Sequence, residues 1–479
     1  MDQSPSPTVD HHPIDDDLQS LLESQRKAFQ AHPYPTLEER QNKLERLHKG
    51  LITHKDALAR ALSEDFGHRS EFDSIMADIL PSLNQLKYTK SKLKKWLKPT
   101  ARHAGMMVAP AKVKVHYQPL GVVGIIVPWN FPVFMTLSPL ITVLAAGNRA
   151  MIKLSEFTPA TNGVLKTLLA EQFDDTEVAV IEGEAQRSAA FSALPFDHLF
   201  FTGSTTVGRH VMRAAADNLV PVTLELGGKS PVLIADDMGI DDAIKRIFFG
   251  KSLNAGQICV APDYILLPEG KQDAFIDAYR RYFQTCYPAG LASQDYTSVI
   301  NPRQYQRLID TLAEATAAGA QAHPVCDHPR DDANHRLAPH LLTGVTDTMR
   351  IMQEEIFGPL LPVITYTDIN DAIAQIQARP RPLALYLMSF NAELQQQVIQ
   401  QTHAGGVAIN ETLMHVAADD APFGGIGPSG MGHYHGFEGF QTFSKAKTVL
   451  TQGRFASGAL AHPPYNRFIH KMMLKLLVR

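Results

Sequence analysis

An α/β protein with a mainly parallel sheet is the fold class that the sequence predicts. From position 121 onward, short apolar segments with β-strand character alternate with helical segments, which is the pattern of βαβ crossovers. These strands are apolar throughout rather than alternating between apolar and polar residues, so both faces of the sheet are expected to be covered. Before them, positions 16–97 carry apolar residues spaced by three and four among charges, which predicts a helical N-terminal region.

The segment 121–226 predicts a doubly wound, Rossmann-like domain. Helices are expected at 133–146 and 159–173, and strands at 121–127, 150–154, 178–181, 198–201 and 222–226. Ligands of such sheets bind beyond the carboxyl ends of the strands. The loops at Pro128, Leu154, Thr202 and Glu225 should therefore converge on one crevice.

Three further regions complete the predicted fold. A second α/β region is expected at 229–405, with strands at 264–267 and 361–365. Residues 106–118 shift toward a period of two, which predicts an exposed β-ribbon. The C-terminus predicts an amphipathic helix whose basic stripe consists of Arg467, Lys471, Lys475 and Arg479. Packing of this helix on a partner subunit or on the protein body is favoured, and a peripheral membrane contact is the less favoured alternative.

Composition excludes several classes of protein. The 479 residues are 44% hydrophobic and 20% charged, which is ordinary for a globular chain and far from the composition of disordered proteins. The net charge of -4 provides no global positive field that would recruit nucleic acid, so a small molecule is the expected partner. Only three cysteines occur, and the acidic N-terminus carries no apolar signal segment, so a reducing, cytoplasmic location is expected.

The segment FTGSTTVG at 201–208 is a candidate for binding a pyrophosphate. It lacks the G-x-G-x-x-G fingerprint, and Arg209 and His210 stand where a Walker A motif requires Lys and Ser or Thr, which argues against an NTPase. Gly203 and Ser204 lie in a turn between a predicted strand and a predicted helix, where backbone N–H groups can bind phosphate. Such turns are also common connectors, so this segment alone leaves dinucleotide binding open.

Cys259, in the segment GQICVAP, is the candidate nucleophile. Gly and Pro bound this segment, whereas an inert core cysteine is expected amid apolar periodicity; Cys286 and Cys326 lack such a setting and are expected to be structural. A thiol nucleophile needs a base, and Glu225 could act as one through a water molecule. Glu225 also lies 17 positions after Gly208, near where a Rossmann acidic residue binds ribose, and an ordinary carboxylate remains a third interpretation.

Seven motifs, in order, resemble the NAD(P)-dependent aldehyde dehydrogenase superfamily. They are PWNFP (128–132), KLSE (153–156), FTGSTTVG (201–208), ELGGKSP (225–231), GQICVAPDY (256–264), EEIFGP (354–359) and PFGGIGPSGMG (422–432). The PDY after the cysteine resembles the class 3 branch. Within this branch, INETLMHVAADD (409–420) and the HPPYNRFIHK tail are similar to the bacterial coniferyl aldehyde dehydrogenases.

The resemblance implies a division of the chain into three parts. It places an NAD-binding domain with its N-terminal helices at 1–97 and 121–225, and a catalytic domain that carries the nucleophilic cysteine at 226–406. It places a bridging oligomerisation arm and C-terminal tail at 98–120 and 424–479, which implies a homodimer.

The resemblance also implies a role for each candidate residue. Cys259 attacks the aldehyde to give a thiohemiacetal and then a thioester, and Asn130 stabilises the oxyanion together with the Cys259 backbone N–H. Glu225 activates the water that releases the acid. The expected cofactor-binding residues are Trp129, Lys153, Glu156, Gly203, Ser204, Glu355 and Phe357. Lys153 and Glu156 hold the adenosine ribose, and Glu355 and Phe357 position the nicotinamide ribose and ring.

The expected reaction is oxidation of an aromatic aldehyde such as coniferyl aldehyde, or of a medium-chain apolar aldehyde, by NAD. Glu156 should repel a 2'-phosphate, so NAD is favoured over NADP, although relatives in class 3 often use both. No metal is expected, because the four histidines His403, His415, His433 and His435 match no catalytic motif. Alternatives are a cysteine-dependent esterase, a non-catalytic binding protein on the same fold, and a CoA-acylating relative, against which Glu225 argues by favouring water.

Overall fold

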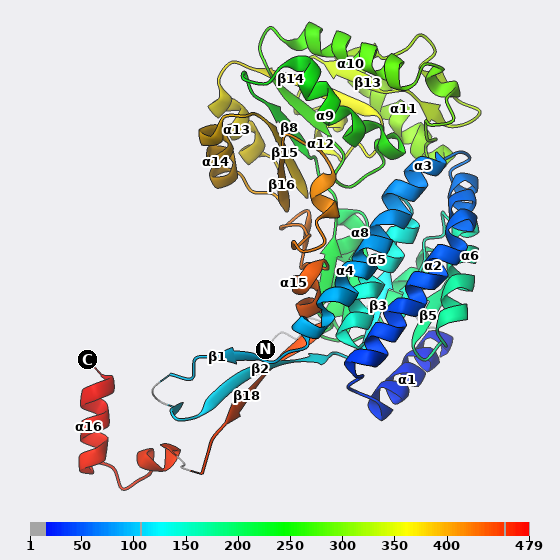
Figure 1. Ribbon diagram of the computed structural model, residues 1–479. Coiled ribbons are helices and arrows are strands. Elements are labelled where there is room, and N and C mark those ends of the chain that lie inside the picture. The colour runs from blue at the N-terminus through cyan, green and yellow to red at the C-terminus, as the bar shows by residue number, and fades with distance from the viewer. Residues whose placement is uncertain (1–15, 106–107, 455–456, 479) are drawn as a thin grey trace, which may run out of the picture.

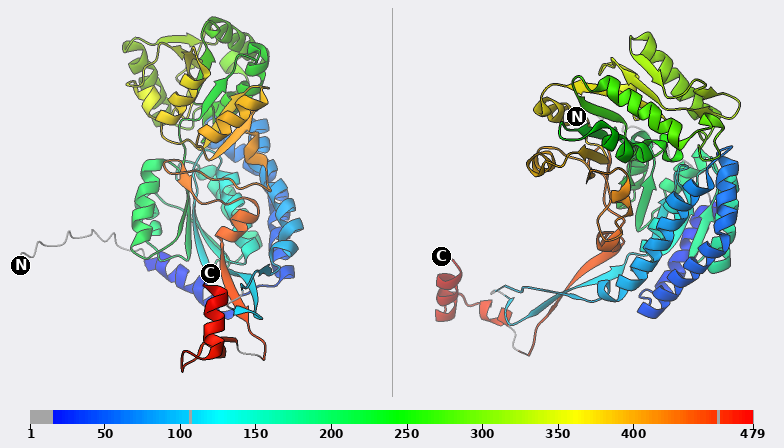
Figure 2. Two further views of the ribbon diagram at one scale, coloured as in Figure 1. Left: turned by 90° about the vertical axis from the view of Figure 1, so that its left-hand side faces the viewer. Right: turned by 45° about the horizontal axis from the view of Figure 1, so that its top comes forward.

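The computed structural model describes residues 16–105, 108–454 and 457–478, which form two α/β units and a projecting arm (Figure 1, Figure 2). The acidic N-terminal stretch discussed above lies outside the described residues, as do the first two positions of the predicted ribbon. The helical N-terminal region is confirmed. It comprises α1 (Asp16–Ala31), α2 (Leu37–Asp65), α3 (Glu71–Ser74), a π-helix (Ile75–Ile79) and α4 (Leu80–Trp96).

The first unit is built on a six-stranded sheet in the order β17-β7-β6-β3-β4-β5. Its parallel strands are β3 (Val122–Ile126), β4 (Arg149–Lys153), β5 (Val178–Ile181), β6 (His198–Thr202) and β7 (Val222–Glu225). The helices α5 (Pro132–Ala146) and α6 (Pro159–Gln172) contact one another, and so do α7 (Ala185–Ser192) and α8 (Thr205–Ala216). The predicted strands and helices are therefore confirmed, and the sheet is doubly wound.

A late strand closes one edge of this sheet. Residues Gly430–Met431 form β17, which pairs antiparallel with β7 so that Gly430 lies opposite Glu225. After it, α15 (Gly436–Thr442) packs on α4 and α5. The division expected from the sequence assigned everything after 424 to the arm and tail. The structure corrects this, because residues 430–442 pack against the first unit.

The second unit contains a seven-stranded sheet in the order β10-β13-β14-β9-β8-β15-β16. Its strands are β8 (Pro231–Ile234), β9 (Tyr264–Pro268), β10 (Gln321–Pro324), β13 (His340–Thr343), β14 (Leu360–Tyr366), β15 (Ala384–Met388) and β16 (Gly406–Ile409). Its helices are α9 (Ile240–Ser252), α10 (Gln272–Cys286), α11 (Pro302–Ala317), α12 (Arg350–Gln353), α13 (Ile369–Ala378) and α14 (Ala392–Gln401), and a small hairpin joins β11 (Arg330–Asp331) to β12 (Arg336–Leu337). All pairings within the large sheet are parallel except that of β10 with β13.

The arm is a three-stranded antiparallel sheet that projects from the body (Figure 1, Figure 2). It consists of β1 (Thr100–Arg102), β2 (Lys112–Pro119) and β18 (Ser444–Thr451), with β2 in the middle. The predicted ribbon and the predicted C-terminal helix, α16 (Phe468–Leu477), are both present, and α16 lies at the far end of the arm. Within the described residues, no helix has the length and apolar character needed to cross a membrane.

Candidate active site

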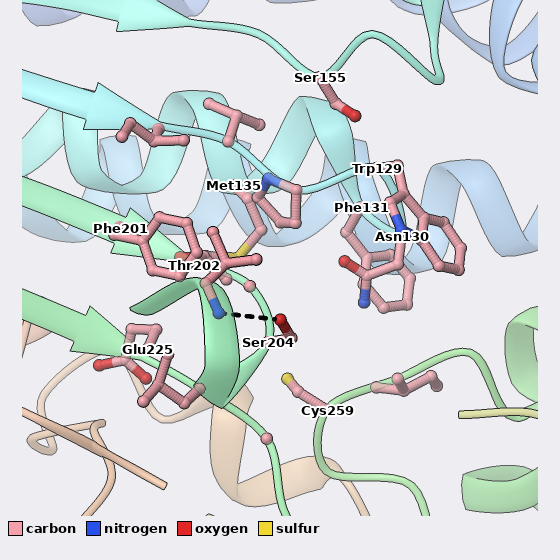
Figure 3. A pocket seen from close by; sticks show the side chains of 18 of the residues that line it. Trp129, Asn130, Phe131, Met135, Ser155, Phe201, Thr202, Ser204, Glu225 and Cys259 are labelled. Atoms are coloured by element: carbon pink, nitrogen blue, oxygen red, sulfur yellow. Dashed lines mark hydrogen bonds between the residues drawn. The ribbon is translucent and has the colours of Figure 1, made fainter. Parts of the chain in front are cut away.

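A single large cavity of about 2030 Å³ brings together residues from both α/β units. Pro128, Ser155, Thr202 and Glu225 line it, and each lies at or just beyond the carboxyl end of a parallel strand. The predicted convergence of four loops is therefore confirmed, with Ser155 lining the wall next to the buried Leu154. The second unit contributes Cys259 from the opposite side (Figure 3).

Cys259 is placed by a loop whose backbone departs sharply from helical geometry. After α9 ends, Asn254, Ala255 and Gly256 adopt φ values of 50°, 50° and 74°. Left-handed backbone is costly for non-glycine residues and is typical of functional sites. A Cβ on Gly256 would lie 2.7 Å from the carbonyl oxygen of Gly358, so this loop passes directly against the loop that carries Glu355 and Phe357.

The Cys259 thiol faces the cavity in a setting that disfavours its ionised form. Burial, together with the negative charges of Glu355 and Glu225, raises the pKa of this thiol above its usual range. Cys259, Cys286 and Cys326 are all free thiols. Of the three, only Cys259 lines the cavity.

Asn130 lies across the cavity from Cys259 (Figure 3). It follows β3, is 5% exposed, and donates one amide hydrogen from Nδ2 to the Gln257 carbonyl oxygen at 3.2 Å. A primary amide carries two such hydrogens, so one remains for a ligand in the cavity.

Glu225 ends β7 and is buried in the cavity wall. Neither of its carboxyl oxygens has a hydrogen-bond partner in the described part of the protein. Burial raises the pKa of Glu225 well above its ordinary value, because desolvation penalises the charged carboxylate. Gly424 passes close by, and a Cβ there would lie 3.1 Å from Glu225 Oε1.

Glu355 and Phe357 enter the cavity from the loop after α12. Burial raises the pKa of Glu355 to about 8, helped by the negative charge of Asp263. A Cβ on Gly227 would lie 2.2 Å from Glu355 Oε2, so only glycine lets this carboxyl approach the backbone after β7. Phe357 has a φ of 49°, and its ring meets the Trp129 ring edge-on at a centroid distance of 5.2 Å.

Of the remaining predicted cofactor residues, Glu156, Gly203 and Ser204 line the cavity, whereas Lys153 does not. Lys153 is 1% exposed and donates from Nζ to the Leu154 carbonyl oxygen at 2.7 Å, while Glu156 lies exposed on the cavity wall. Ser204 Oγ accepts a hydrogen bond from the Val207 N–H at 3.3 Å and caps α8 (Figure 3). Ser204 and Gly203 both line the wall at this helix N-terminus, where a phosphate would meet unpaired N–H groups.

The donor set fits a dinucleotide. The cavity runs from the α8 N-terminus to Cys259, and Glu355 Oε1 is buried along it without a hydrogen-bond partner in the described residues. A ribose hydroxyl would satisfy such an atom. Within residues 16–105, 108–454 and 457–478, no group of three or more His, Cys, Asp or Glu side chains is arranged to hold a metal ion.

Sequence reasoning missed the apolar wall around Cys259. This wall includes Phe131, Phe134, Met135, Phe249, Leu413, Met414, Phe423 and Tyr434. Phe134 and Met135 belong to the apolar run at 133–146, which predicts a buried helix and masks their contact with the cavity, and Phe131 lies just before that run. Phe249 is distant in the sequence, and the remaining four residues fall within 413–434 at spacings that match neither a helix nor a strand.

Comparisons with known proteins place the chain in a class. The Aldehyde dehydrogenase family model matches residues 12–449. A "Probable coniferyl aldehyde dehydrogenase" of Pseudomonas aeruginosa is 51% identical over 462 residues and covers 96% of each chain. A "Coniferyl aldehyde dehydrogenase" of Pseudomonas sp. is 45% identical over 464 residues and also covers 96% of each chain.

Solved structures agree with this class. The substrate-bound state of Staphylococcus aureus AldH is 38% identical, has a TM-score of 0.91, and covers 96% of this chain and 99% of its own. An aldehyde dehydrogenase of Mycobacterium tuberculosis complexed with NAD+ is 30% identical, has a TM-score of 0.83, and covers 92% of this chain and 91% of its own.

The fold, the cavity and these comparisons together define a nicotinamide-dependent oxidoreductase. The chain belongs to the aldehyde dehydrogenase family. It is an NAD(P)-dependent aldehyde dehydrogenase, an enzyme that oxidises an aldehyde to the carboxylic acid.

The raised pKa of Glu355 makes a prediction about stability. In the unfolded chain a glutamate releases its proton near its model value of 4.5, whereas the folded protein keeps the proton until about pH 8. Between these values the unfolded state binds fewer protons, so this carboxyl lowers the free energy of unfolding as the pH rises. Glu355→Gln removes that loss, and we expect the variant to gain thermal stability over wild type at about pH 9 but much less at about pH 5.

Thermal unfolding midpoints of both proteins at the two pH values measure this difference. Glu354→Gln, at the exposed neighbouring position, is the matched control and should shift the midpoint equally at both pH values. Equal shifts for Glu355→Gln would contradict the burial of an acidic proton at this site.

Proposed function

We propose that the enzyme oxidises aromatic aldehydes of the coniferyl type, or medium-chain apolar aldehydes, with NAD+ and water. The observation that carries the mechanism is the meeting of Cys259, the free amide hydrogen of Asn130 and the unpartnered Glu225 carboxyl in one cavity. The apolar wall around Cys259 supports an apolar substrate. The names of the two Pseudomonas relatives support the coniferyl type.

The chain's own residues supply the nucleophile, the oxyanion donor and the base. The Cys259 thiol gives up its proton to water as Sγ bonds to the carbonyl carbon, and the carbonyl oxygen takes up negative charge that the Asn130 amide and the Cys259 backbone N–H stabilise. A nicotinamide ring held beside Phe357 would supply the hydride acceptor, and Cys259 would then carry the acyl group as a thioester. Glu225 removes a proton from water, the resulting oxygen attacks the thioester, and the C–S bond breaks to free the acid and the thiolate.

The high proton affinity of Glu225 suits it to this step. A buried carboxylate that lacks hydrogen-bond donors is a stronger base than one in water, because nothing in its surroundings stabilises the charge. Water that enters the cavity next to it meets no competing donor at the carboxyl oxygens among the described residues. Glu225 is therefore proposed as the base rather than as a ribose ligand.

Except for the buried Lys153, the proposed cofactor residues line the cavity. We propose that Lys153 and Glu156 bind the adenosine ribose, that Gly203 and Ser204 bind the pyrophosphate, and that Glu355 binds the nicotinamide ribose. Trp129 and Phe357, in edge-on contact, would flank the ring region. The Glu156 carboxylate should repel a 2'-phosphate, so NAD is proposed as the preferred cofactor.

Substitution of the nucleophile and of the base should give different kinetics. We expect Cys259→Ala to abolish turnover while leaving NAD+ binding intact. We expect Glu225→Gln to keep a single-turnover burst of NADH while steady-state turnover falls about 100-fold or more, because only thioester hydrolysis is slowed. Stopped-flow NADH absorbance measures both phases, and an unchanged steady-state rate for Glu225→Gln would remove it as the base.

A panel of aldehydes tests the substrate class. We expect kcat/KM for coniferyl aldehyde and for medium-chain apolar aldehydes to exceed that for acetaldehyde by at least about tenfold, because the apolar wall contacts only the larger substrates. NADH or NADPH absorbance with each cofactor in turn gives both preferences. Higher efficiency with acetaldehyde, or with NADP+, would refute the corresponding part of the proposal.

We also propose a cytoplasmic homodimer in which the arm and the C-terminal helix contact the partner. The arm leaves β18 as an edge strand, and α16 exposes Phe468, Met472 and Leu476. We expect light scattering to give twice the mass of one chain for the full protein. A variant that ends before β18, and therefore also lacks α16, should be a monomer. A full-length protein that is monomeric would contradict the dimer. If the full chain binds to anionic vesicles and the truncated variant does not, the membrane alternative is favoured.

A further inference from the structure

Arg69 lies behind the cavity, with no exposed side-chain surface, and bonds to the backbone of the residue proposed as oxyanion donor. Its Nη1 donates to the Asn130 carbonyl oxygen at 3.0 Å, and its Nη2 donates to Asp78 Oδ2 at 2.8 Å. The planar guanidinium of Arg69 therefore donates to a main-chain oxygen from one terminal nitrogen and to a buried carboxylate from the other.

Asn130 is held at both ends by groups that face away from the cavity. Its carbonyl oxygen accepts a second hydrogen bond, from Asn254 Nδ2 at 3.2 Å, and its side-chain amide donates to the Gln257 carbonyl oxygen. Gln257 is itself fixed, because its Oε1 accepts from the Ile300 N–H at 3.0 Å and its Nε2 donates to the Ser298 carbonyl oxygen at 3.1 Å. One amide hydrogen of Asn130 is thus left with a fixed direction.

The partner of Arg69 is anchored as firmly. Asp78 lies on the π-helix Ile75–Ile79, and its second oxygen accepts from the Phe134 N–H at 2.8 Å. The same N-terminal segment reaches the nucleophile loop through Asp73, whose Oδ2 accepts from the Asn254 N–H at 3.1 Å and from Thr297 Oγ1 at 2.9 Å. Residues 69–79 therefore connect the loop of Asn130 to the loop that leads to Cys259.

The energetic argument favours a role in geometry over one in stability. Both partners of the Arg69–Asp78 pair are fully buried, and such pairs contribute little net stability because desolvation offsets their attraction. Arg69 Nε has no hydrogen-bond partner among the described residues, which adds to the cost. The Phe66 and Phe131 rings lie 5.0 and 5.1 Å from the guanidinium carbon and also face its charge.

We propose that Arg69, held by Asp78, is a positioning residue that aims the free Asn130 amide hydrogen at the oxygen of the thiohemiacetal. The inference rests on the proposed role of Asn130 as oxyanion donor. Arg69 touches no substrate and acts through the Asn130 backbone, whose displacement by even about 1 Å would weaken a hydrogen bond that forms fully only in the transition state.

Arg69→Lys is the direct test, because a lysine retains the charge but cannot form both planar contacts. We expect the NADH burst to slow about 10- to 100-fold, whereas the NAD+ dissociation constant stays within about twofold. We expect alkylation of Cys259 by iodoacetamide also to stay within about twofold, because that reaction uses the sulfur but forms no oxyanion. Asp78→Asn, a second variant, should slow the burst in the same direction.

Arg40→Lys is the matched control. Arg40 is equally buried and donates from Nε and Nη1 to the carbonyl oxygens of Pro35 and Ala145, both at 3.0 Å. Ala145 is at the opposite end of α5 from the Asn130 loop. The same substitution there should lower thermal stability without slowing the burst of the folded enzyme.

Several results would overturn the proposal. An unchanged burst rate in Arg69→Lys is one, and an equal loss of burst rate, alkylation rate and NAD+ affinity in that variant is another. An equally slow burst in Arg40→Lys would also overturn it. Failure of both Arg69→Lys and Asp78→Asn to fold would show that the pair serves stability. Asn130→Ala distinguishes a failure of the proposed role of Asn130 from a failure of the proposed role of Arg69. If its burst is normal, the oxyanion role of Asn130 fails; if its burst is lost while that of Arg69→Lys is normal, only the role of Arg69 fails.

Discussion

Burial of three acidic groups in one cavity, the Cys259 thiol and the carboxyls of Glu225 and Glu355, is the constraint on which the rest of the site depends. Each group is more difficult to ionise here than in water, and the negative charges of the two glutamates add to the cost of forming a thiolate. The protonation of these three groups is therefore expected to change when a cationic ring or water enters the cavity. Tight glycine contacts at positions 227 and 424 make this close grouping of acids sterically feasible.

Two kinds of scaffold hold these groups. The parallel sheet delivers Glu225 and the loop of Asn130 from the carboxyl ends of β7 and β3, which lie on either side of β6, as expected for a doubly wound fold. The nucleophile loop is less regular: three consecutive left-handed residues carry Cys259 away from α9, and the buried Asp73 carboxylate accepts a hydrogen bond from the Asn254 N–H within this loop. The irregular backbone is thus held by a residue nearly two hundred positions earlier in the chain.

The sequence predicted those features that depend on residues close together in the chain. Continuous apolar strands predicted β3 to β7, and the Gly and Pro around Cys259 separated it from the other two thiols. Arg69 and Asp78 could not be found this way, because a charged pair in a helical segment looks like an ordinary solvated face. The residues of the apolar wall at 413–434 follow neither a helical nor a strand spacing, and the pairing of Gly430–Met431 with β7 was missed because a two-residue strand leaves no periodicity to detect.

Order of synthesis gives the strand at Gly430–Met431 a further consequence. One edge of strand β7, which ends in Glu225, stays unpaired until Gly430–Met431 has been synthesised. The nascent first domain therefore leaves the ribosome with an unprotected β-edge. Until residues 430–431 have been translated, that edge is free to pair with other extended chains, and polypeptides terminated before them would never close it. The same short strand that pairs with the end of β7 at Glu225 therefore also protects this edge of the first sheet from pairing with other chains.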